Sequence, residues 1–347
     1  MKGRIVVLDS FRGHEAAALI VDGVMQDLII AGGRKAPPGP GTMFWAVTDR
    51  ILNEQGSAIL RLPEGRAFLR QSKNLRPGQS LLVQVTGHAE PGKATPVTQK
   101  PVFKSRFAIV TPGVPGINIA RSVKDREMRC ALLLLARDIM KDASDGLILR
   151  SAVAHGAMDA IAEDIAATLA SCERIKGNSA GDRPKLLAKA PGPHLLAWRD
   201  WSLPKPDTVV EDARGFEHFG ILAEIDRLES PRIDLPDDAF AFIEPTRALI
   251  AVDVNTGGDT SPAAALKANI ALARALPRAL RLRGLGGQIT VDFVPVSRRD
   301  RQRLERLLKV SFQHDSVDTA LVGWTPSGHF ELQRKRERLP LFQVLRE

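Results

Sequence analysis

Two short apolar runs near the C-terminal end each contain one aspartate, and together they constrain the fold more than any other feature. The runs are residues 252–255, with Asp253, and residues 291–293, with Asp292. Between them, residues 262–283 carry apolar side chains at roughly helical spacing. A strand, a crossover helix and a second strand normally give neighbouring parallel strands. The pattern therefore predicts that both aspartates lie side by side at corresponding strand ends.

A carboxylate in an apolar setting has to be paired, hydrogen-bonded or coordinated to a metal. Strand alternation puts Asp253 and Asn255 on one face, and Ile250, Val252 and Val254 on the other. Oxygen ligands select hard cations, so we expect Mg²⁺, with Mn²⁺ as the alternative. Two carboxylates are fewer than a two-metal clamp normally shares. A single ion that polarises a phosphate oxygen and delivers a water or hydroxide is the favoured chemistry.

Other roles for these polar residues stay open. Glu244 and Asp259 are acids that could add ligands, but nothing in the sequence places them. Asp253 or Asn255, taken alone, could also cap the loop that follows its strand. The presence of a second aspartate favours the cation site.

The helix between the two strands carries its own signals. Pro277 predicts a kink or a division into two helices, because proline cannot donate a backbone hydrogen bond. Gly286 and Gly287 are expected to end the helix before the second strand.

The residues around both aspartates resemble the ribonuclease E/G family. The resemblance lies in residues 248–255, Asn269, residues 281–287 and 291–293, more loosely in 215–225 and 235–236, and again in 328–336. It implies that Asp253 and Asp292 are catalytic residues and the ligands of Mg²⁺, and that Asn255 is a catalytic amide supporting the attacking water. It also implies an endoribonuclease that cleaves single-stranded RNA to 5'-phosphate and 3'-hydroxyl ends.

The resemblance implies an α/β multidomain fold. An RNase H-like scaffold begins in residues 1–34 and returns, shortened, in 179–247; an S1-type (OB) β-barrel in 35–104 and a 5'-sensor unit in 105–178 are inserted into it. A deoxyribonuclease I-like α/β catalytic domain follows in residues 248–347. Clusters of Gly and Pro at 32–40 and 177–184 are predicted linkers.

The barrel region alternates apolar residues with turn signals, which independently predicts several short strands. By resemblance, Phe68 is the RNA-binding residue that stacks a base and Lys93 is a basic contact. Ile59 stands where a partner aromatic is expected, and losing one stacking contact costs about 1–3 kcal/mol per base. We therefore expect a weakened grip on RNA. The alternative is that Phe68 belongs to the barrel core.

The 5'-sensor unit supplies a candidate phosphate site. By resemblance, Arg150, Ser151 and Ile109 contact the 5'-terminal nucleotide, and an arginine can fork onto a phosphate while a serine adds a hydroxyl donor. Ser105 replaces a glycine of the family, which puts a close backbone approach in doubt. The alternative is that Arg150 forms an ordinary surface ion pair.

A basic run follows the second aspartate and includes Arg298, Arg299 and Arg301. The chain has a formal net charge of +9, which favours a polyanionic partner. Because the run follows the Asp292 strand directly, we expect these RNA-binding arginines to carry a phosphate backbone near the metal. The alternative is an ordinary solvated helix face.

Several classes of protein are disfavoured. The first apolar run is too short for a signal peptide, and no run is long enough for a membrane helix, so a cytoplasmic protein with no membrane partner is expected. Cys130 and Cys172 are isolated, which predicts no disulfide framework and no structural zinc. Better-known family members carry a zinc motif and a small dimerising domain. This chain resembles a short form without them, so any homo-oligomer is expected to assemble without a zinc-link.

The leading interpretation is therefore an Mg²⁺-dependent endoribonuclease of RNA processing or decay. The alternative is a catalytically weak RNA-binding protein that keeps the fold, and a third is a nuclease acting on DNA, because no motif reads the 2'-hydroxyl. A lone histidine such as His329 is expected to be structural, since isolated histidines usually are.

Overall fold

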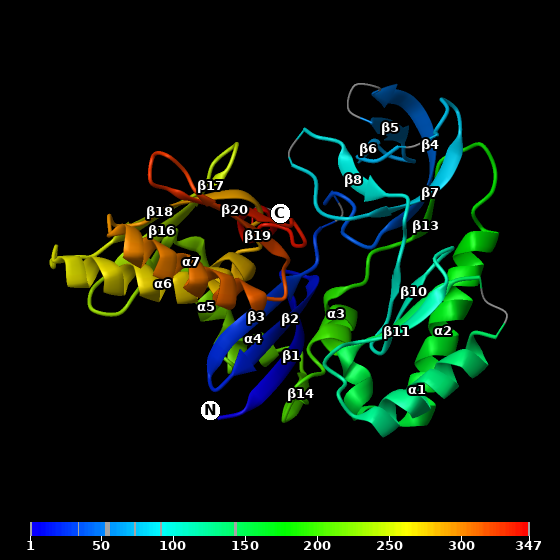
Figure 1. The fold of residues 1–347 in the computed structure, drawn as a ribbon, viewed down its shortest axis with the longest axis horizontal. Coiled ribbons are helices and arrows are strands. Elements are labelled where there is room, and N and C mark those ends of the chain that lie inside the picture. Colours follow the sequence, from blue (N-terminus) through cyan, green and yellow to red (C-terminus); the bar gives the residue numbers. More distant parts are fainter. Residues whose placement is uncertain are drawn as a thin grey trace. The chain divides into compact units, whose positions relative to one another are not determined.

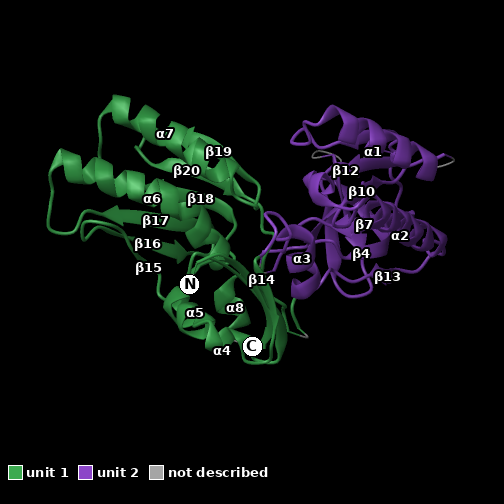
Figure 2. Cartoon of the chain, turned by 90° about the horizontal axis from the view of Figure 1, so that it is seen from below, with its two compact units in different colours: residues 1–36, 207–347 green, residues 37–206 purple. Residues whose placement is uncertain are grey.

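The computed structural model describes residues 2–33, 35–52, 56–72, 74–90, 92–141 and 144–345 (Figure 1). The chain divides into two compact units (Figure 2). Unit 1 combines residues 1–36 with 207–347, and unit 2 comprises residues 37–206. Unit 2 is thus inserted into unit 1 along the sequence. Among the described helices, none combines the length and the apolar character needed to cross a bilayer.

The described residues of unit 1 form two sheets and five helices. The first sheet has the order β14 (Thr208–Glu211), β1 (Arg4–Phe11), β2 (His14–Val21) and β3 (Val24–Ile30). The second has the order β15 (Arg232–Asp234), β16 (Phe240–Pro245), β17 (Ile250–Asn255), β18 (Gly287–Asp292), β20 (Phe330–Arg334) and β19 (Thr319–Trp324). The helices are α4 (Gly215–His218), α5 (Ile221–Glu229), α6 (Pro262–Leu282), α7 (Arg298–Gln313) and α8 (Leu341–Val344).

The six-stranded sheet confirms the predicted strand, helix and strand unit. β17 and β18 are parallel neighbours joined through α6. One face of the sheet is apolar, as in Val252 and Ile289, and packs against Leu272 of α6 and Leu308 of α7 in one buried core. Helices therefore cover that face, while the side chains at alternate strand positions point to the other face, called here the open face.

The helix α6 differs from both signals read in the sequence. It runs through Pro277, which is buried, as one helix, so the predicted division is wrong. The helix ends before Gly284 rather than at Gly286. Gly284 has φ +63°, its N–H donates to Arg281 O at 3.1 Å, and Leu285 N–H donates to Leu280 O at 2.9 Å. These two bonds form a Schellman cap.

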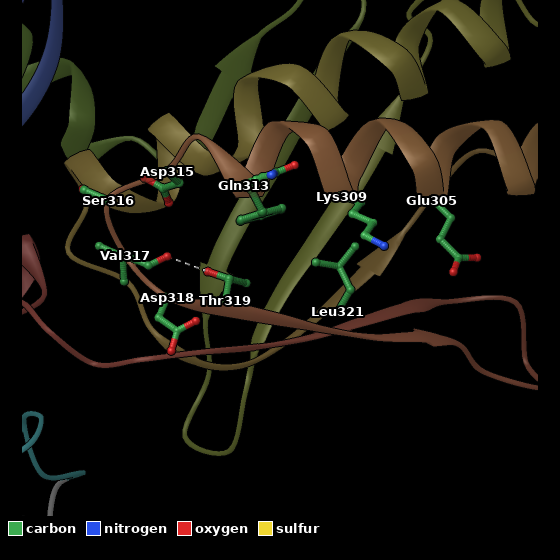
Figure 3. A pocket seen from close by; sticks show the side chains of 10 residues that line it. Glu305, Lys309, Gln313, Asp315, Ser316, Val317, Asp318, Thr319 and Leu321 are labelled. Carbon is green, nitrogen blue, oxygen red and sulfur yellow. Dashed lines mark hydrogen bonds between the residues drawn. The ribbon is translucent and has the colours of Figure 1, made fainter. Parts of the chain in front are cut away.

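A groove of about 720 Å³ lies between α7 and β19 (Figure 3). Lys309 and Glu305 of α7 line one side, and Thr319 and Leu321 of β19 line the other. Leu321 pairs with the buried Leu332, so the groove lies on the helix-covered side of the sheet.

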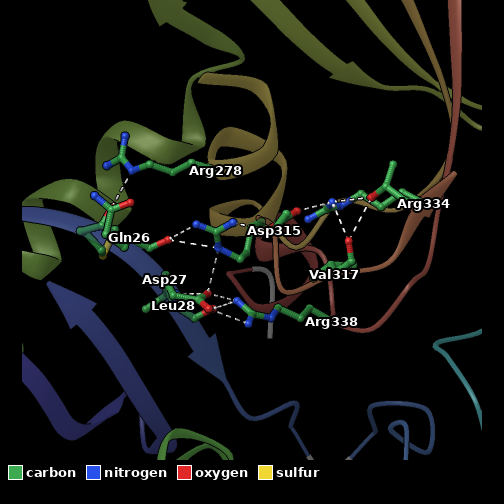
Figure 4. Close-up of polar contacts among 11 residues, drawn as sticks. Gln26, Asp27, Leu28, Arg278, Asp315, Val317, Arg334 and Arg338 are labelled. Carbon is green, nitrogen blue, oxygen red and sulfur yellow. Dashed lines mark hydrogen bonds and ion pairs between the residues drawn. The ribbon is translucent and has the colours of Figure 1, made fainter. Parts of the chain in front are cut away.

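Asp315, at one end of the groove, belongs to a buried ionic network (Figure 4). Its side chain is fully buried and forms ion pairs with Arg281 of α6 and with Arg334 of β20, the second at 2.5 Å. Arg334 is 1% exposed; burial lowers its pKa, and the charge of Asp315 opposes that shift. Each buried charge in this network thus depends on its partner.

The same network connects the two sheets of unit 1. Arg281 donates through Nε and Nη2 to Gln26 O of β3, at 3.1 and 2.7 Å. Asp27 of β3 accepts from Arg338, with 2.9 Å between Nη2 and Oδ2. Arg278 donates to Met25 O at 2.7 Å (Figure 4). Arginines from α6 and from the C-terminal segment therefore hold the edge of the N-terminal sheet.

Unit 2 contains a closed five-stranded barrel of the OB type; the turn signals predicted its short strands, and the family resemblance implied the barrel type. Ladder pairs run β4–β5–β6–β8–β7, and β7 pairs again with β4 to close it. Its interior is apolar, with Ala58, Leu60 and Val83 completely buried. The strands are β4 (Met43–Leu52), β5 (Ser57–Arg61), β6 (Arg66–Leu69), β7 (Ser80–Val85) and β8 (Thr95–Thr98), with β13 (Lys185–Ala188) added to β4.

The rest of unit 2 is a small α/β layer, also in line with the predicted pattern. A four-stranded sheet has the order β11–β12–β10–β9, and α1 and α2 pack on it. Its elements are β9 (Phe103–Lys104), β10 (Ala108–Thr111), β11 (Gly116–Ile119), α1 (Arg126–Ile139), β12 (Gly146–Leu149), the 3₁₀ helix η2 (Ser151–His155) and α2 (Met158–Gly177); α3 (Pro193–Asp200) follows β13.

The chain returns from unit 2 to unit 1 at residue 207, which is later than the linker predicted at 177–184. Residues 185–206 stay with unit 2, because β13 pairs with the barrel strand β4. From residue 207 the chain rejoins unit 1, and β14 pairs in parallel with β1. The second linker signal therefore marks a connection inside unit 2. Arg34, within the first linker signal, lies outside the described residues.

Replacing Asp315 with alanine should strongly destabilise unit 1, because Arg334 would keep a buried, uncompensated charge. The expected loss is about 3–5 kcal/mol of unfolding free energy. Asp318→Ala is the matched control: its side chain is 71% exposed and pairs with Lys335 at 3.1 Å, so its loss should stay below about 1 kcal/mol. Urea unfolding followed by circular dichroism measures both. Equal losses in the two variants would contradict the role assigned to the network.

Candidate functional site

The two aspartates occupy matching positions on neighbouring strands. β17 and β18 are parallel, and Asp253 is the direct partner of Asp292 at the last pair of the ladder. Directly paired residues of neighbouring strands project to the same face, with backbones about 4.8 Å apart. The structure thus brings together the two carboxylates that the sequence placed at corresponding strand ends.

Both carboxylates lie on the open face, so the apolar setting expected from the sequence is wrong. Val252 and Val254 point into the core, while Asp253 between them is exposed. The Asp292 side chain is 62% exposed. The apolar residues around each acid belong to the opposite face, because side chains alternate along a strand. These carboxylates are accessible to solvent and to a large ligand.

Asn255 lies beside Asp253 on the same face, as predicted. Its Nδ2 donates to Asp253 Oδ2 at 3.0 Å. In the described ranges neither side chain accepts a backbone N–H, so the alternative of a loop cap finds no support. The amide instead orients one carboxylate oxygen.

The charge of the pair is not balanced by a basic side chain. Within the described parts of the chain, no lysine or arginine nitrogen lies within 4.0 Å of either carboxylate. The ionisable side chain recorded within 4.0 Å of the pair in these parts is His329, whose Nε2 is 3.8 Å from Asp292 Oδ1. Like charges directly opposite on adjacent strands are unfavourable. Two oxygen donors with uncompensated charge fit a hard divalent cation such as Mg²⁺ or Mn²⁺.

The two further acids considered as ligands lie away from this pair. Glu244 is exposed and is paired with Ala251, one same-face step from Asp253 along the sheet. Asp259 accepts from Ser261 N–H at 2.8 Å, and this backbone bond lowers the pKa of Asp259. Its carboxylate thus has a local role in the loop before α6.

Asn269 has a structural role that its position in the sequence motif did not reveal. It is completely buried in α6, donates to Val294 O at 2.8 Å and accepts from Val294 N–H at 3.1 Å. Val294 follows Asp292 by two residues. The amide therefore fixes the chain where it leaves β18, and so fixes the direction of the second carboxylate.

An aromatic strip on the open face adjoins the acids, and sequence analysis did not identify it. Phe242 is the cross-strand partner of Asp253, and Phe240 that of Asn255. The two rings are half-buried and meet edge to face, with centroids 5.7 Å apart. The Arg232 guanidinium covers Phe240 at 4.1 Å. Phenylalanines at the alternate positions 240 and 242 are the sequence signal that could have identified this strip.

The basic helix α7 packs mainly on the covered face, behind the acids. Arg298 and Arg299 are exposed in its first turn, which follows β18 closely. Arg301 is half-buried and lies over the Trp324 ring, 5.0 Å from its centroid. Arg298 and Arg299 are thus free to meet a backbone that passes the strand ends, whereas Arg301 also supports the β19–β20 hairpin. The groove of Figure 3 lies on this covered side and contains neither aspartate.

Arg150 is engaged within unit 2. Its guanidinium donates to Ser105 O at 2.6 Å and to Asp200 at 2.7 Å. Burial raises the pKa of Asp200, but hydrogen bonds from Arg199 and Arg150 outweigh this and hold the pKa below its usual value. Ser151 is exposed at the start of η2, and Ile109 is half-buried on β10. The three sensor candidates therefore lie on or just after the two central strands of one small sheet, β10 and β12.

The barrel candidates lie on its outer surface. Phe68 is half-buried between the buried Ala67 and Leu69, so the alternative that Phe68 fills the core is wrong. Its cross-strand partner is Ile59. Lys93 is exposed and pairs with Glu90 at 2.5 Å. Phe68 thus lacks a neighbouring aromatic on β5.

The cysteines do not provide a better metal centre. Cys172 is buried close to Asp145 and Glu173, and these are the one described group of three side chains near enough to share an ion. Lys176 already donates to Asp145 at 2.5 Å and to Glu173 at 3.0 Å. Burial raises the pKa of Cys172 to about 12, so the thiol stays protonated. Lys176 occupies the place that a cation would take.

The chain is similar to known proteins, and the similarity includes the segment that carries both aspartates. The profile of the Ribonuclease E/G family matches residues 208–337, which include both aspartates. The chain is 26% identical to Ribonuclease E of Nostoc sp. over 95% of this chain and 56% of that protein. It is 27% identical to Ribonuclease G of Escherichia coli over 79% of this chain and 63% of that protein. It is 26% identical to a chloroplastic Ribonuclease E/G-like protein of Arabidopsis thaliana over 76% of this chain and 31% of that protein.

Substituting Asp292 with asparagine should stabilise the metal-free protein, because it removes the repulsion between two paired carboxylates. In EDTA we expect an increase of about 0.2–1 kcal/mol in the free energy of unfolding. Asp226→Asn, at an exposed position of α5, is the control and should leave it unchanged. Urea unfolding measures both, and excess Mg²⁺ should abolish the advantage. A destabilised Asp292→Asn protein in EDTA would contradict the geometry.

Proposed function

The chain belongs to the ribonuclease E/G family, and on this premise we propose that it is a divalent-metal-dependent endoribonuclease acting on single-stranded RNA. The observation that carries the proposal is the in-register pair Asp253 and Asp292, with Asn255 beside it on an open face. Mg²⁺ is the preferred ion for an oxygen donor set. Cleavage is expected to leave 5'-phosphate and 3'-hydroxyl ends. The chain spans 56–63% of the Nostoc and Escherichia coli relatives, which carry the ribonuclease names.

The two aspartates share one task in this proposal, and two asparagines support them. Asp253 and Asp292 would hold the ion, which when bound supplies a Lewis acid for a phosphate oxygen. Asn255 fixes one Asp253 oxygen by its hydrogen bond and leaves its own carbonyl oxygen to accept from an attacking water. Asn269 keeps the strand end after Asp292 in place.

The open face offers a path for the RNA. Phe242 and Phe240 form an aromatic surface next to the acids, on which bases stack without sequence preference. Arg298 and Arg299, after β18, supply cations for the backbone, and the net charge of +9 favours such a partner. In unit 2 we propose Phe68 and Lys93 as further RNA contacts.

The proposed architecture keeps the five parts expected from the sequence. We propose that the four-stranded sheet of unit 1 corresponds to an RNase H-like scaffold, and the six-stranded sheet to a deoxyribonuclease I-like catalytic part that begins at β15 rather than at residue 248. We propose that unit 2 corresponds to the S1-type barrel and the 5'-sensor, with residues 179–206, which were expected in the scaffold, added to it.

A second candidate is an RNA-binding protein that cleaves poorly. It is favoured by Ile59, which stands beside Phe68 and provides no second stacking surface on the barrel. Poor delivery of RNA would slow cleavage even with an intact metal site.

Cleavage of a labelled single-stranded RNA, compared with the same DNA sequence, separates these candidates. With Mg²⁺ the wild-type protein should cut the RNA, and EDTA should stop it. Asp253→Asn and Asp292→Asn should each lower the rate by more than about a hundredfold, because the charge stabilisation of the transition state is lost. Asp226→Asn is the control and should cut at the wild-type rate.

A wild-type protein that binds this RNA yet leaves it intact with Mg²⁺ supports the RNA-binding candidate. Cleavage of DNA at the same rate supports a nuclease without sugar selectivity. If both asparagine variants cleave as fast as the wild type, the assignment of Asp253 and Asp292 as the catalytic metal site is wrong.

The 5'-sensor proposal predicts a preference for RNA with a 5'-monophosphate over a 5'-hydroxyl. Arg150 would exchange its bond to Asp200 for the terminal phosphate, and Ser151 would add a hydroxyl donor. Arg150→Ala should abolish the preference, while Arg137→Ala, in the last turn of α1, should retain it. Rates on the two substrates measure the ratio. Equal wild-type rates would remove the sensor from the proposal.

A further inference from the structure

His329 completes a row of side chains across four neighbouring strands. Phe242 pairs with Asp253, Asp253 pairs with Asp292, and Val291 pairs with Phe330 in the antiparallel ladder of β18 and β20. One step further along that ladder, Asp292 lies opposite His329. Phe330 is buried on the covered side, so His329 projects to the open face. Sheet register therefore places the imidazole next to the second aspartate.

The turn before β20 orients the imidazole ring. His329 Nδ1 is 3.1 Å from Ser327 Oγ, which is 2.9 Å from Thr325 Oγ1. Thr325 Oγ1 in turn accepts from His329 N–H at 3.1 Å, and Thr325 N–H donates to His329 O at 2.8 Å. When Nδ1 carries the ring proton and donates to Ser327, Nε2 presents a lone pair. That lone pair faces Asp292 Oδ1 at 3.8 Å.

We propose that Nε2 of His329 is a third protein ligand of the cation held by Asp253 and Asp292. This inference rests on the proposed function and specifies the donor set of the same site. A lone pair and a carboxylate oxygen that face each other form no hydrogen bond, and a cation between them makes the contact favourable. The Ser327 hydroxyl has the position of the outer partner that fixes the tautomer of a metal-bound histidine.

The ligand atoms of Asp253, Asp292 and His329 do not all lie within 4.8 Å of one another, so side-chain rotation has to bring them together around an ion. Neighbouring ligands of an octahedral ion at about 2.1 Å lie about 3 Å apart. The 3.8 Å between Nε2 and Oδ1 therefore has to shorten by less than about 1 Å. His329 precedes β20 in an exposed turn, and its side chain is 39% exposed. A change of its side-chain torsions supplies that movement.

An imidazole ligand changes which metal the site prefers. An all-oxygen set suits Mg²⁺, whereas imidazole nitrogen binds transition metals better and Mn²⁺ accepts a mixed set. With His329 in place the site should bind Mn²⁺ much more tightly than Mg²⁺. Without His329 the two carboxylates should discriminate less between these ions.

Metal titration of the full chain, in the absence of RNA, tests the proposal. Calorimetry with MnCl₂ and with MgCl₂ gives the ratio of the two affinities. His329→Gln should lower the Mn²⁺ affinity by about tenfold or more, at the low end of what partners of a metal site contribute, and should change Mg²⁺ affinity far less. The matched control is His314→Gln, at an exposed histidine at the end of α7, and it should keep the wild-type ratio. Circular dichroism verifies that each variant is folded.

Pulsed electron paramagnetic resonance of bound Mn²⁺ provides an independent measurement. A directly bound imidazole gives a nitrogen coupling, which we expect in the wild type and in His314→Gln but not in His329→Gln. A wild-type site without nitrogen coupling, or an unchanged affinity ratio in His329→Gln, overturns the proposal for His329. If Asp253→Asn and Asp292→Asn leave the binding of both metals unchanged, the metal site of the proposed function fails instead.

Discussion

The hydrogen-bonded register between β17 and β18 is the constraint on which the candidate site depends. It makes Asp253 and Asp292 direct partners, and the adjoining ladders extend the same row to Phe242 and toward His329. A shift of one residue in any of these strands would move its side chain to the covered face. The buried core beneath the sheet prevents such a shift, because Val252, Val291 and Phe330 would then have to leave it. Packing on one face thus fixes the chemistry on the other.

The ionic network behind β20 has a complementary role. Asp315 pairs with Arg281 of α6 and with Arg334 of β20, and Asp27 pairs with Arg338 of the C-terminal segment. Arg281 and Arg338 also donate to backbone carbonyls of β3. Paired in this way, the charges are tolerated in the interior and lock one arrangement of the two sheets. Helix α6, which joins the two aspartate strands, is therefore anchored to the N-terminal sheet, and β20, the neighbour of β18, is anchored to Asp315.

The sequence-based expectations succeeded where a feature depends on residues close together in the sequence, and they failed where it depends on tertiary contacts. Strand alternation and the crossover rule were sufficient for the β17, α6 and β18 unit and for the facing of Asp253 and Asn255. Local rules failed at Pro277 and at the helix end, where the buried face of α6 and the φ angle of Gly284 decide. His329 seemed an isolated structural histidine because its neighbour Asp292 is 37 positions away in the sequence and adjacent only through the ladder. The ion pair of Arg150 with Asp200 spans 50 positions and was equally hidden.

The sequence by itself determined the strand, helix and strand unit, the short strands of the barrel and the positions of the two acids and their amide, because each depends on local periodicity or on a short motif. Tertiary structure alone decided that the acids lie on an open face, that an aromatic strip adjoins them, and that a histidine completes their row. The physical reason is that exposure and cross-strand neighbours arise from which face the helices cover and from the register of non-adjacent strands. Neither is encoded in any single segment.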